Sequence, residues 1–221
     1  MPADLSHIDV WIFDLDNTLY PPGSEFIALM ENRMTDFVAR ETGLPRAEAR
    51  ALQKKYLYEH GTTLAGLMAH HGVPPEPFLT EVHDVAIDSL QPDPVLGQAI
   101  ARLPGRRLVF TNGDARHAAR VLAHLGLDHL FEDVFHIAAA DYIPKPRPEA
   151  FARMIGRHRV DPRRSAFFED SVRNLEPAAR LGMTTVLVGP TAPEAGTPFI
   201  HHQTADLAAF LSAARLKETA N

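Results

Sequence analysis

The sequence predicts an α/β protein in which a parallel sheet carries helices on both faces and is interrupted by an all-helical insertion. Short apolar runs rich in aromatic and β-branched residues recur along the chain, and from residue 107 onward they alternate with helical patterns. Residues 15–106, in contrast, contain no convincing strand. We therefore expect one α/β core that accommodates a second, helical unit near its N-terminus.

Five apolar runs are predicted to be strands. Each has the length of a strand and lacks a clean alternation of apolar and polar residues, which is typical of strands buried on both faces. In chain order the runs are VWIFD (10–14), RLVFT (107–111), VFHIA (134–138), AFFED (166–170) and TTVLVG (184–189).

The helices of the sheet domain are predicted from apolar residues at helical spacing and from end signals. In DARHAARVLAHLGL, Ala118, Val121, Leu122 and Leu125 share one face, and Gly126 ends the helix. Similar patterns occur in DPVLGQAIARL (93–103), PEAFARMIGRH (148–158), NLEPAARLG (174–182) and TADLAAFLSAARLKET (204–219). The last is expected to be an amphipathic helix packed on the sheet domain.

The insertion contains three predicted helices. They are EFIALMENRMTDFVARETG (25–43), PRAEARALQKKYLYEHG (45–61) and PEPFLTEVHDVAIDSL (75–90), and GTTLAGLMAHHG (61–72) separates the second from the third. We therefore place the helical insertion at residues 21–90 and the sheet domain at residues 1–20 and 91–221.

Composition excludes several classes of function. A formal net charge of -6 with scattered arginines argues against a nucleic-acid polymer as partner, and the absence of cysteine excludes disulfides and thiolate chemistry. The N-terminal residues lack the pattern of a signal peptide, and no stretch approaches the roughly 20 apolar residues of a membrane span. We expect a soluble cytoplasmic protein with no membrane partner.

Polar and charged residues gather where the predicted strands end. Because the functional crevice of an open parallel sheet lies outside the carboxyl ends of its strands, these residues should meet at one rim. They are Asp14, Asp16, Thr111, Asn112, Lys145, Glu169 and Asp170. Hard oxygen ligands without thiolate suit Mg²⁺, whose charge, with that of Lys145, would offset the repulsion between the aspartates.

The same rim fits phosphoryl transfer. One aspartate can attack phosphorus while its neighbour delivers a proton to the leaving oxygen, and Thr111 and Lys145 can hold the phosphoryl oxygens. Simpler explanations exist, since aspartates also cap turns and helices and Lys145 could be a solvated loop residue. The twelve histidines show no ligand spacing tied to the strand ends and are interpreted as surface or satisfied interior groups.

Four motifs in this order resemble those of the haloacid dehalogenase superfamily: DLDNTL (14–19), VFTNG (109–113), PKPRP (144–148) and FFEDSVRN (167–174). The resemblance implies a Rossmann-like core with a helical cap between the first and second motifs. It also implies that Asp14 is the nucleophile, forming an aspartyl-phosphate, and that Asp16 is general acid and then base. Asp14, the Asp16 carbonyl and Asp170 would bind Mg²⁺ with help from Glu169, while Thr111, Asn112 and Lys145 would bind phosphate.

Further segments are similar to the pyrimidine 5'-nucleotidase branch, whose members hydrolyse nucleoside monophosphates such as UMP and CMP. They are DLDNTLYP (14–21), GTTLAGL (61–67) and EDSVRNLEPA (169–178). Glu169 stands where that branch often has aspartate, which leaves open whether it ligates the metal directly or through water. Tyr56, His60, Thr62 and Thr63 are candidates to face the substrate, although Tyr56 at helical spacing from Leu52 fits the core of the cap equally well.

Other functions remain compatible with the same motifs. A phosphatase for phosphoglycolate or a sugar phosphate is the nearest alternative. A 2-haloacid dehalogenase fits less well, because Asp16, Glu169 and Asp170 supply acid catalysis and metal sites which that reaction does not need. A non-catalytic binding protein would be expected to have lost one of these positions. The sequence leaves open the leaving group of the substrate, the oligomeric state and the position of the cap.

Overall fold

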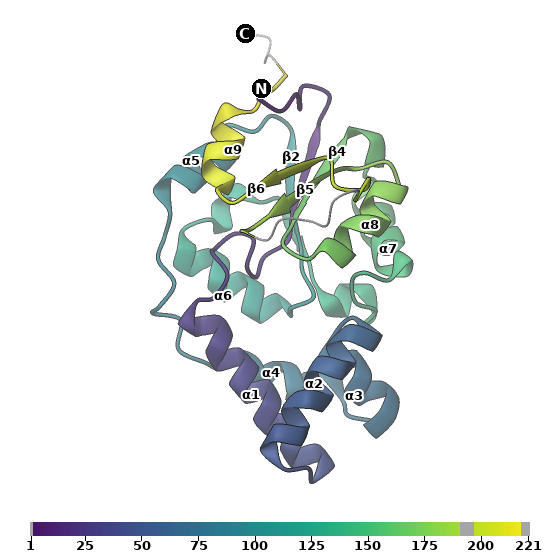
Figure 1. The fold of residues 1–221 in the computed structure, drawn as a ribbon. Coiled ribbons are helices and arrows are strands. Elements are labelled where there is room, and N and C mark those ends of the chain that lie inside the picture. The colour runs from purple at the N-terminus through teal and green to yellow at the C-terminus, as the bar shows by residue number, and fades with distance from the viewer. Residues whose placement is uncertain (1, 191–196, 218–221) are drawn as a thin grey trace.

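The computed structural model describes residues 2–190 and 197–217, and in this part of the chain six strands form one parallel sheet (Figure 1). The strand order is β3-β2-β1-β4-β5-β6. The strands are β1 (Val10–Phe13), β2 (Arg106–Phe110), β3 (Asp133–Phe135), β4 (Ser165–Glu169), β5 (Thr184–Val188) and β6 (His202–Thr204). The predicted α/β fold is confirmed, and β1 lies between β2 and β4 in the middle of the sheet.

Alternation along the strands divides the core into two layers. Trp11 and Phe13 belong to one buried cluster, whereas Val10 and Ile12 belong to another, because successive side chains of a strand point to opposite faces. Apolar residues of α5 (Pro94–Ala101), α6 (Ala115–Leu125) and α9 (Leu207–Ala213) complete the first cluster, and those of α7 (Pro148–His158) and α8 (Val172–Arg180) complete the second. Helices therefore cover both faces of the sheet (Figure 1).

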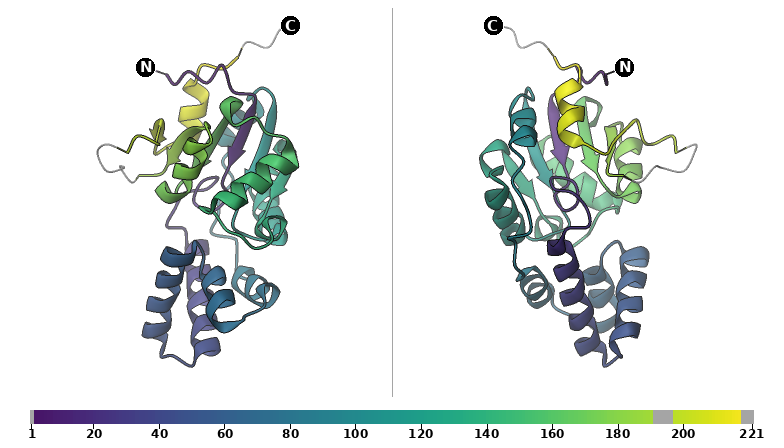
Figure 2. Two further views of the ribbon diagram at one scale, coloured as in Figure 1. Left: turned by 90° about the vertical axis from the view of Figure 1, so that its right-hand side faces the viewer. Right: turned by 60° about the vertical axis from the view of Figure 1, so that its left-hand side comes forward.

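The helical insertion lies beyond the carboxyl ends of the strands (Figure 2). Its helices are α1 (Glu25–Thr42), α2 (Arg46–His60), α3 (Thr63–His71) and α4 (Pro75–His83). They enclose a separate apolar cluster that includes Phe37, Val38, Leu67 and Phe78. We call this group the cap; its limits at residues 21 and 90 stay a prediction.

Two segments of the cap differ from the sequence-based expectation. Residues 63–71, predicted to be part of a connection, form α3, because the Thr62 hydroxyl caps its N-terminus and Leu64 and Leu67 reach the core of the cap. The helix predicted over 75–90 ends at His83, where Arg120 of α6 donates hydrogen bonds to the carbonyls of His83 and Val85.

The sheet domain also differs in detail. Of the third apolar run (134–138), only Val134 and Phe135 lie in a strand, β3, which begins one residue earlier at Asp133, and the short helix η2 (Ile137–Ala140) follows it. Strand β6 was not predicted, because its three residues are polar and pair through backbone groups at the sheet edge. The C-terminal helix covers only Leu207–Ala213, and residues 218–219 of its predicted range lie outside the described residues.

Within the described ranges, no helix combines the length and the apolar character needed to cross a membrane.

Candidate active site

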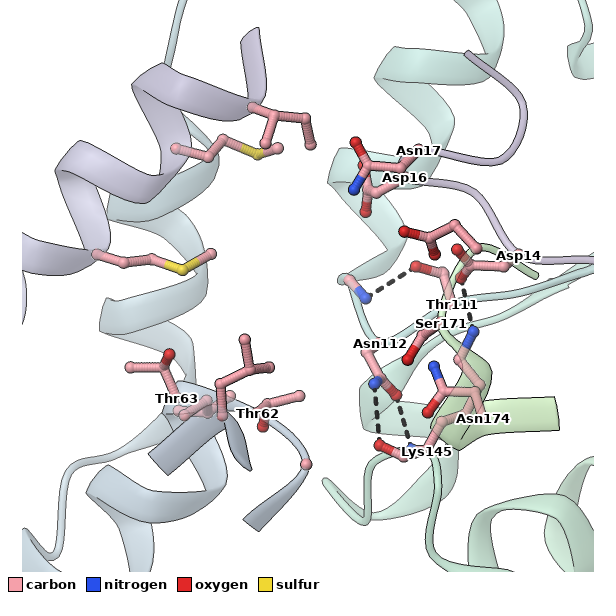
Figure 3. A pocket seen from close by; sticks show the side chains of 18 of the residues that line it. Asp14, Asp16, Asn17, Thr62, Thr63, Thr111, Asn112, Lys145, Ser171 and Asn174 are labelled. Atoms are coloured by element: carbon pink, nitrogen blue, oxygen red, sulfur yellow. Dashed lines mark hydrogen bonds and ion pairs between the residues drawn. The ribbon is translucent and has the colours of Figure 1, made fainter. Parts of the chain in front are cut away.

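Three neighbouring strands bring the predicted rim together. Asp14 follows β1, Thr111 follows β2, and Glu169 ends β4. The Asp14 backbone N–H donates to the Phe168 carbonyl at 2.9 Å, which extends the pairing of β1 with β4 to the aspartate itself. The central position of β1 therefore fixes Asp14 at the middle of the rim, with the other side chains around it (Figure 3).

Lys145 is the central cation of this rim. Its Nζ donates to Asp14 Oδ1 at 2.6 Å, to Glu169 Oε2 at 2.8 Å and to the Phe110 carbonyl at 2.8 Å, and the side chain is only 1% exposed. Burial alone would lower the pKa of Lys145, but the negative charges of Asp14 and Glu169 outweigh it and raise the pKa. The lysine is therefore a fixed positive charge at neutral pH.

The carboxylates outnumber this lysine. Oxygen atoms of Asp14, Glu169 and Asp170 all lie within 4.8 Å of one another. Burial, reinforced by their mutual repulsion, raises the pKa of Asp14 and of Glu169 to about 7 and that of Asp170 to about 6. A divalent cation would relieve this excess of negative charge, and an all-carboxylate donor set suits a hard ion such as Mg²⁺.

Asp16 has different surroundings. Its Oδ1 accepts hydrogen bonds from Tyr20 Oη at 2.6 Å and from His117 Nε2 at 2.8 Å, while the side chain stays 25% exposed toward the cavity. Burial alone would raise the pKa of Asp16, but the positive charge of His117 and these two hydrogen bonds lower it to about 2. Asp14 and Asp16 are thus neighbours whose pKa values are pushed in opposite directions.

The side chain of Asn112 has a role that was not predicted. Its Nδ2 donates to the Lys145 carbonyl at 3.2 Å, and its Oδ1 accepts from the Lys145 backbone N–H at 2.8 Å. The amide therefore holds the loop that carries Lys145, and Asn112 also lines the cavity, so its phosphate-binding role stays a prediction. Thr111 is buried beside it, and its Oγ1 accepts from the Gly113 N–H at 2.9 Å.

A cavity of about 520 Å³ separates the rim from the cap (Figure 3). Asp14, Asp16, Thr111, Lys145 and Asp170 contribute to its walls on the side of the sheet. The cap contributes a largely apolar wall, interrupted by a few polar side chains. The apolar residues are Ile27, Met30, Met34, Leu57, Leu64, Phe78 and Leu79, and the polar ones include Gln53, Thr62 and Thr63.

Two of the four predicted substrate residues lie elsewhere. Thr62 and Thr63 line the cavity, as expected, but Tyr56 and His60 do not. Tyr56 is buried in the core of the cap, where its hydroxyl lies 2.8 Å from His71 Nε2, and His60 Nε2 lies 3.0 Å from His70 Nε2. Both belong to the face of α2 that packs against α3, so the structure places them away from this cavity, and only Thr62 and Thr63 stay predicted substrate contacts.

The interpretation of the histidines also needs correction. His117 is buried and contacts Asp16, although its position in the sequence shows no ligand spacing tied to the strand ends. A usable signal was its position in the first turn of the helix that follows VFTNG, because that turn lies next to the strand ends. Tyr20, Gln53, His83 and Arg173 were likewise not predicted to lie at the site.

A family model described as haloacid dehalogenase-like hydrolase matches residues 8–182. Phosphate metabolism protein 8 of Saccharomyces cerevisiae is 27% identical over 194 residues, which cover 80% of this chain and 60% of that protein. The fructose-1-phosphate phosphatase YqaB of Escherichia coli is 34% identical over 109 residues, which cover 48% of this chain and 56% of that enzyme. The matched regions thus span under two thirds of either relative.

Solved structures share the fold. The hydrolase YfnB of Bacillus subtilis, described as bound to magnesium, has a TM-score of 0.63 at 16% identity, over 93% of this chain and 97% of that one. A 2-haloacid dehalogenase of Pseudomonas syringae pv. Tomato DC3000 has a TM-score of 0.60 at 20% identity, again over 93% and 97%. At such identities the similarity concerns the fold alone.

Proposed function

This chain belongs to the haloacid dehalogenase-like hydrolases, and from that premise we propose that it is a Mg²⁺-dependent phosphomonoester hydrolase, most specifically a pyrimidine 5'-nucleotidase. In this proposal the catalytic core comprises residues 1–20 and 91–221, and residues 21–90 form a cap that covers the substrate. The substrate is a small phosphorylated metabolite rather than a nucleic-acid polymer.

The observation that carries the proposal is the buried contact of Lys145 with Asp14 in the wall of the cavity. A carboxylate held beside a fixed cation can attack an anionic phosphoryl group, because the cation offsets the repulsion between the two anions. Asp14 would form a bond to phosphorus while the bond from phosphorus to the leaving oxygen breaks. Thr111 and Lys145 would hold the remaining phosphoryl oxygens.

Asp16 would supply and then remove the proton. It delivers a proton to the leaving oxygen, and afterwards takes one from the water that hydrolyses the aspartyl-phosphate. With no substrate bound, its lowered pKa keeps it ionised. An arriving phosphate adds negative charge beside it, which raises its proton affinity and prepares it to act as an acid.

The residues present fit a magnesium ion. Asp14, Asp170 and the backbone carbonyl of Asp16 would hold it, and its charge would offset the clustered carboxylates and polarise the phosphoryl group. Both oxygens of Glu169 already have partners, since Oε2 accepts from Lys145 and Oε1 accepts from the Ser171 N–H at 3.1 Å. This favours a Glu169 that assists through water rather than by direct ligation.

The cap wall favours a nucleoside as the leaving group. Side chains such as Met30, Met34 and Phe78 offer apolar surface to a flat base, and the polar side chains among them can contact its edge and the ribose. On the cap these polar side chains are Glu31, Gln53, Thr62, Thr63 and His83. The choice of a pyrimidine rests further on the motif resemblance of residues 14–21, 61–67 and 169–178. The similarity to a fructose-1-phosphate phosphatase makes a sugar phosphate the second candidate.

The test is phosphate release from a panel of monoesters in the presence of Mg²⁺. The panel contains UMP, CMP, dUMP, dTMP, AMP, GMP, phosphoglycolate, fructose 1-phosphate and other sugar phosphates, with EDTA as control. Preference for pyrimidine nucleotides supports the proposal in full, and preference for sugars retains the mechanism but rejects the substrate. No release from any ester, or release of halide from a 2-haloacid without metal, would reject the phosphatase assignment.

A further inference from the structure

Within the proposed function, we infer that His117 is a positioning residue that aims the Asp16 carboxylate at the leaving oxygen, and that side chains of the cap hold the His117 ring in place. Neither role follows from the four motifs, because His117 lies four residues beyond the second motif and the cap residues lie outside all four.

The first observation is that the two oxygens of the Asp16 carboxylate have different surroundings. His117 and Tyr20 both donate to Oδ1. Among the described residues no donor contacts Oδ2, which lies near Gly113, since a Cβ atom on that glycine would be 3.7 Å from Oδ2 and 3.3 Å from Thr111 Oγ1. One oxygen is therefore fixed, and the other is left beside the proposed phosphate site.

The second observation is that the hydrogen bond to Asp16 is the only one the His117 ring makes with any described residue. Its Nδ1 is buried and has no hydrogen-bond partner in that part of the chain. The ring is 2% exposed and is otherwise held by stacking. A ring with a single polar contact, directed at Asp16, has the arrangement of a support for that carboxylate.

The third observation is the origin of the stacking partners. Phe26 of α1 lies parallel to the His117 ring at 5.8 Å between centroids, and His83 of α4 lies at 4.1 Å. His83 Nδ1 is 2.7 Å from Asp114 Oδ2, and Asp114 Oδ1 accepts from the His117 backbone N–H at 2.7 Å. Two cap helices thus meet the ring that orients Asp16, so the orientation of this carboxylate depends on where the cap lies.

A matched pair of substitutions separates the hydrogen bond from the ring. In His117→Gln the side-chain amide nitrogen stands as many bonds from Cα as Nε2 does in histidine, and can still reach Asp16. In His117→Asn the same amide is one bond shorter and cannot. Both variants lose the stacked ring, so any purely structural effect of the ring should be equal in the two.

The readout is kcat/KM for two kinds of ester. Release of an alcohol from UMP, or from whichever alcohol phosphate the substrate panel identifies, needs a proton from Asp16, whereas p-nitrophenolate leaves without one. We expect His117→Asn to lower kcat/KM for the alcohol ester by roughly 10- to 100-fold and that for p-nitrophenyl phosphate by only about threefold or less. His117→Gln, which keeps the hydrogen bond but loses the stacking, should give a ratio between those of His117→Asn and the wild type.

His124→Gln serves as the control, because His124 lies on the same helix and contacts the Leu90 carbonyl at 2.9 Å, away from the cavity. It should leave the ratio unchanged. Equal losses with both esters, or equal ratios in the Asn and Gln variants, would overturn the positioning role. A wild-type protein that hydrolyses neither ester would instead reject the proposed function, so the two failures are distinguishable.

Discussion

Asp14 combines the most central position at the site with an unfavourable electrostatic environment. It is buried, accepts a hydrogen bond from Lys145 and lies next to two other carboxylates. Replacement by asparagine keeps the shape of the side chain and removes the proposed nucleophile. We expect Asp14→Asn to lower kcat by roughly 10³-fold or more while the circular dichroism spectrum stays that of the wild type. Substantial residual turnover would refute the assignment of the nucleophile.

The same residue should make metal-free stability depend on pH. The pKa of Asp14 rises from 3.8 to about 7 on folding, so the folded state binds more protons than the unfolded state between these values. Stability contributed by such an acid is present at low pH and is lost as the pH rises through this window. Glu169 and Asp170, raised from 4.5 to about 7 and from 3.8 to about 6, act in the same direction.

Thermal unfolding in EDTA tests this dependence. At pH 5 Asp14 is largely protonated, so wild type and Asp14→Asn should have similar Tm values; at pH 8 the variant should be more stable by about 3 °C or more. The partly buried His83 and His136, whose pKa values are lowered mainly by desolvation, change stability in the opposite direction in both proteins. Comparing the Tm of the variant with that of the wild type removes this shared contribution. Mg²⁺ at pH 8 should raise the wild-type Tm. If the difference in Tm between Asp14→Asn and the wild type were the same at pH 5 and pH 8, protonation of Asp14 would not explain the pH dependence of stability.

At the scale of single elements, helix α8 of the core is tied to the end of cap helix α2. Arg173 in the first turn of α8 donates to the carbonyls of Leu57 at 3.3 Å and Tyr58 at 2.5 Å, and its guanidinium lies 5.0 Å from the centroid of the Tyr58 ring. These contacts are exposed, so we assign them about 1 kcal/mol in total. A free energy of this size favours the observed position of α2 against α8 but still allows the cap to move away.

Removing this contact should therefore open the cap slightly. We expect Arg173→Ala to increase the population with α2 released by about fivefold, which is what about 1 kcal/mol implies. Faster hydrogen exchange of the amides of residues 57–63 would show it. Arg180→Ala is the matched control, since Arg180 is exposed on the same helix but pairs with Glu176. Equal exchange in the two variants would show that Arg173 does not hold the cap.

Most elements were predictable because local signals determine them. Helix α1 ends at Gly43, whose φ of 70° favours glycine, and the run Val10–Phe13 has the apolar, β-branched and aromatic composition of a strand covered on both faces. The elements that the sequence did not predict correctly are determined by contacts between residues far apart in the chain. Helix α4 ends at His83 through contacts from Arg120, and β6 exists because β5 supplies hydrogen-bond partners. Neither partner is adjacent in the sequence.

At the scale of the whole molecule, the site lies where the cap helices meet the sheet domain. Phe26 and Met30 of α1 belong to an apolar cluster of the sheet domain, and Ile137 of η2 belongs to that of the cap. The chain passes between the two through the segments that precede α1 and follow α4. Gly61 of the cap lies so close to the loop of Lys145 that a Cβ atom there would be 2.8 Å from the Lys145 carbonyl. The cap therefore contacts the loop that supplies the cation.

This arrangement explains which parts of the site the sequence could reveal. Asp14, Thr111, Lys145 and Asp170 follow strands of one sheet, so their order along the chain predicts that they meet. The place of His117 in the first turn after VFTNG puts it near the strand ends, but its contact with Asp16 depends on the packing of α6 in three dimensions. The burial of Tyr56 depends on how α2 packs against α3, which no spacing in the sequence encodes.

The burial of Lys145 has a practical consequence for covalent labelling. Lys54, Lys55 and Lys217 are exposed, whereas Lys145 is 1% exposed and its raised pKa keeps it protonated. An amine-reactive acylating reagent should modify the three exposed lysines of the native protein and spare Lys145, as peptide mass spectrometry would show; acylation of Lys145 at the same rate would contradict its burial. Acylation of Lys145 would therefore identify the molecules in which the structure around this lysine has unfolded.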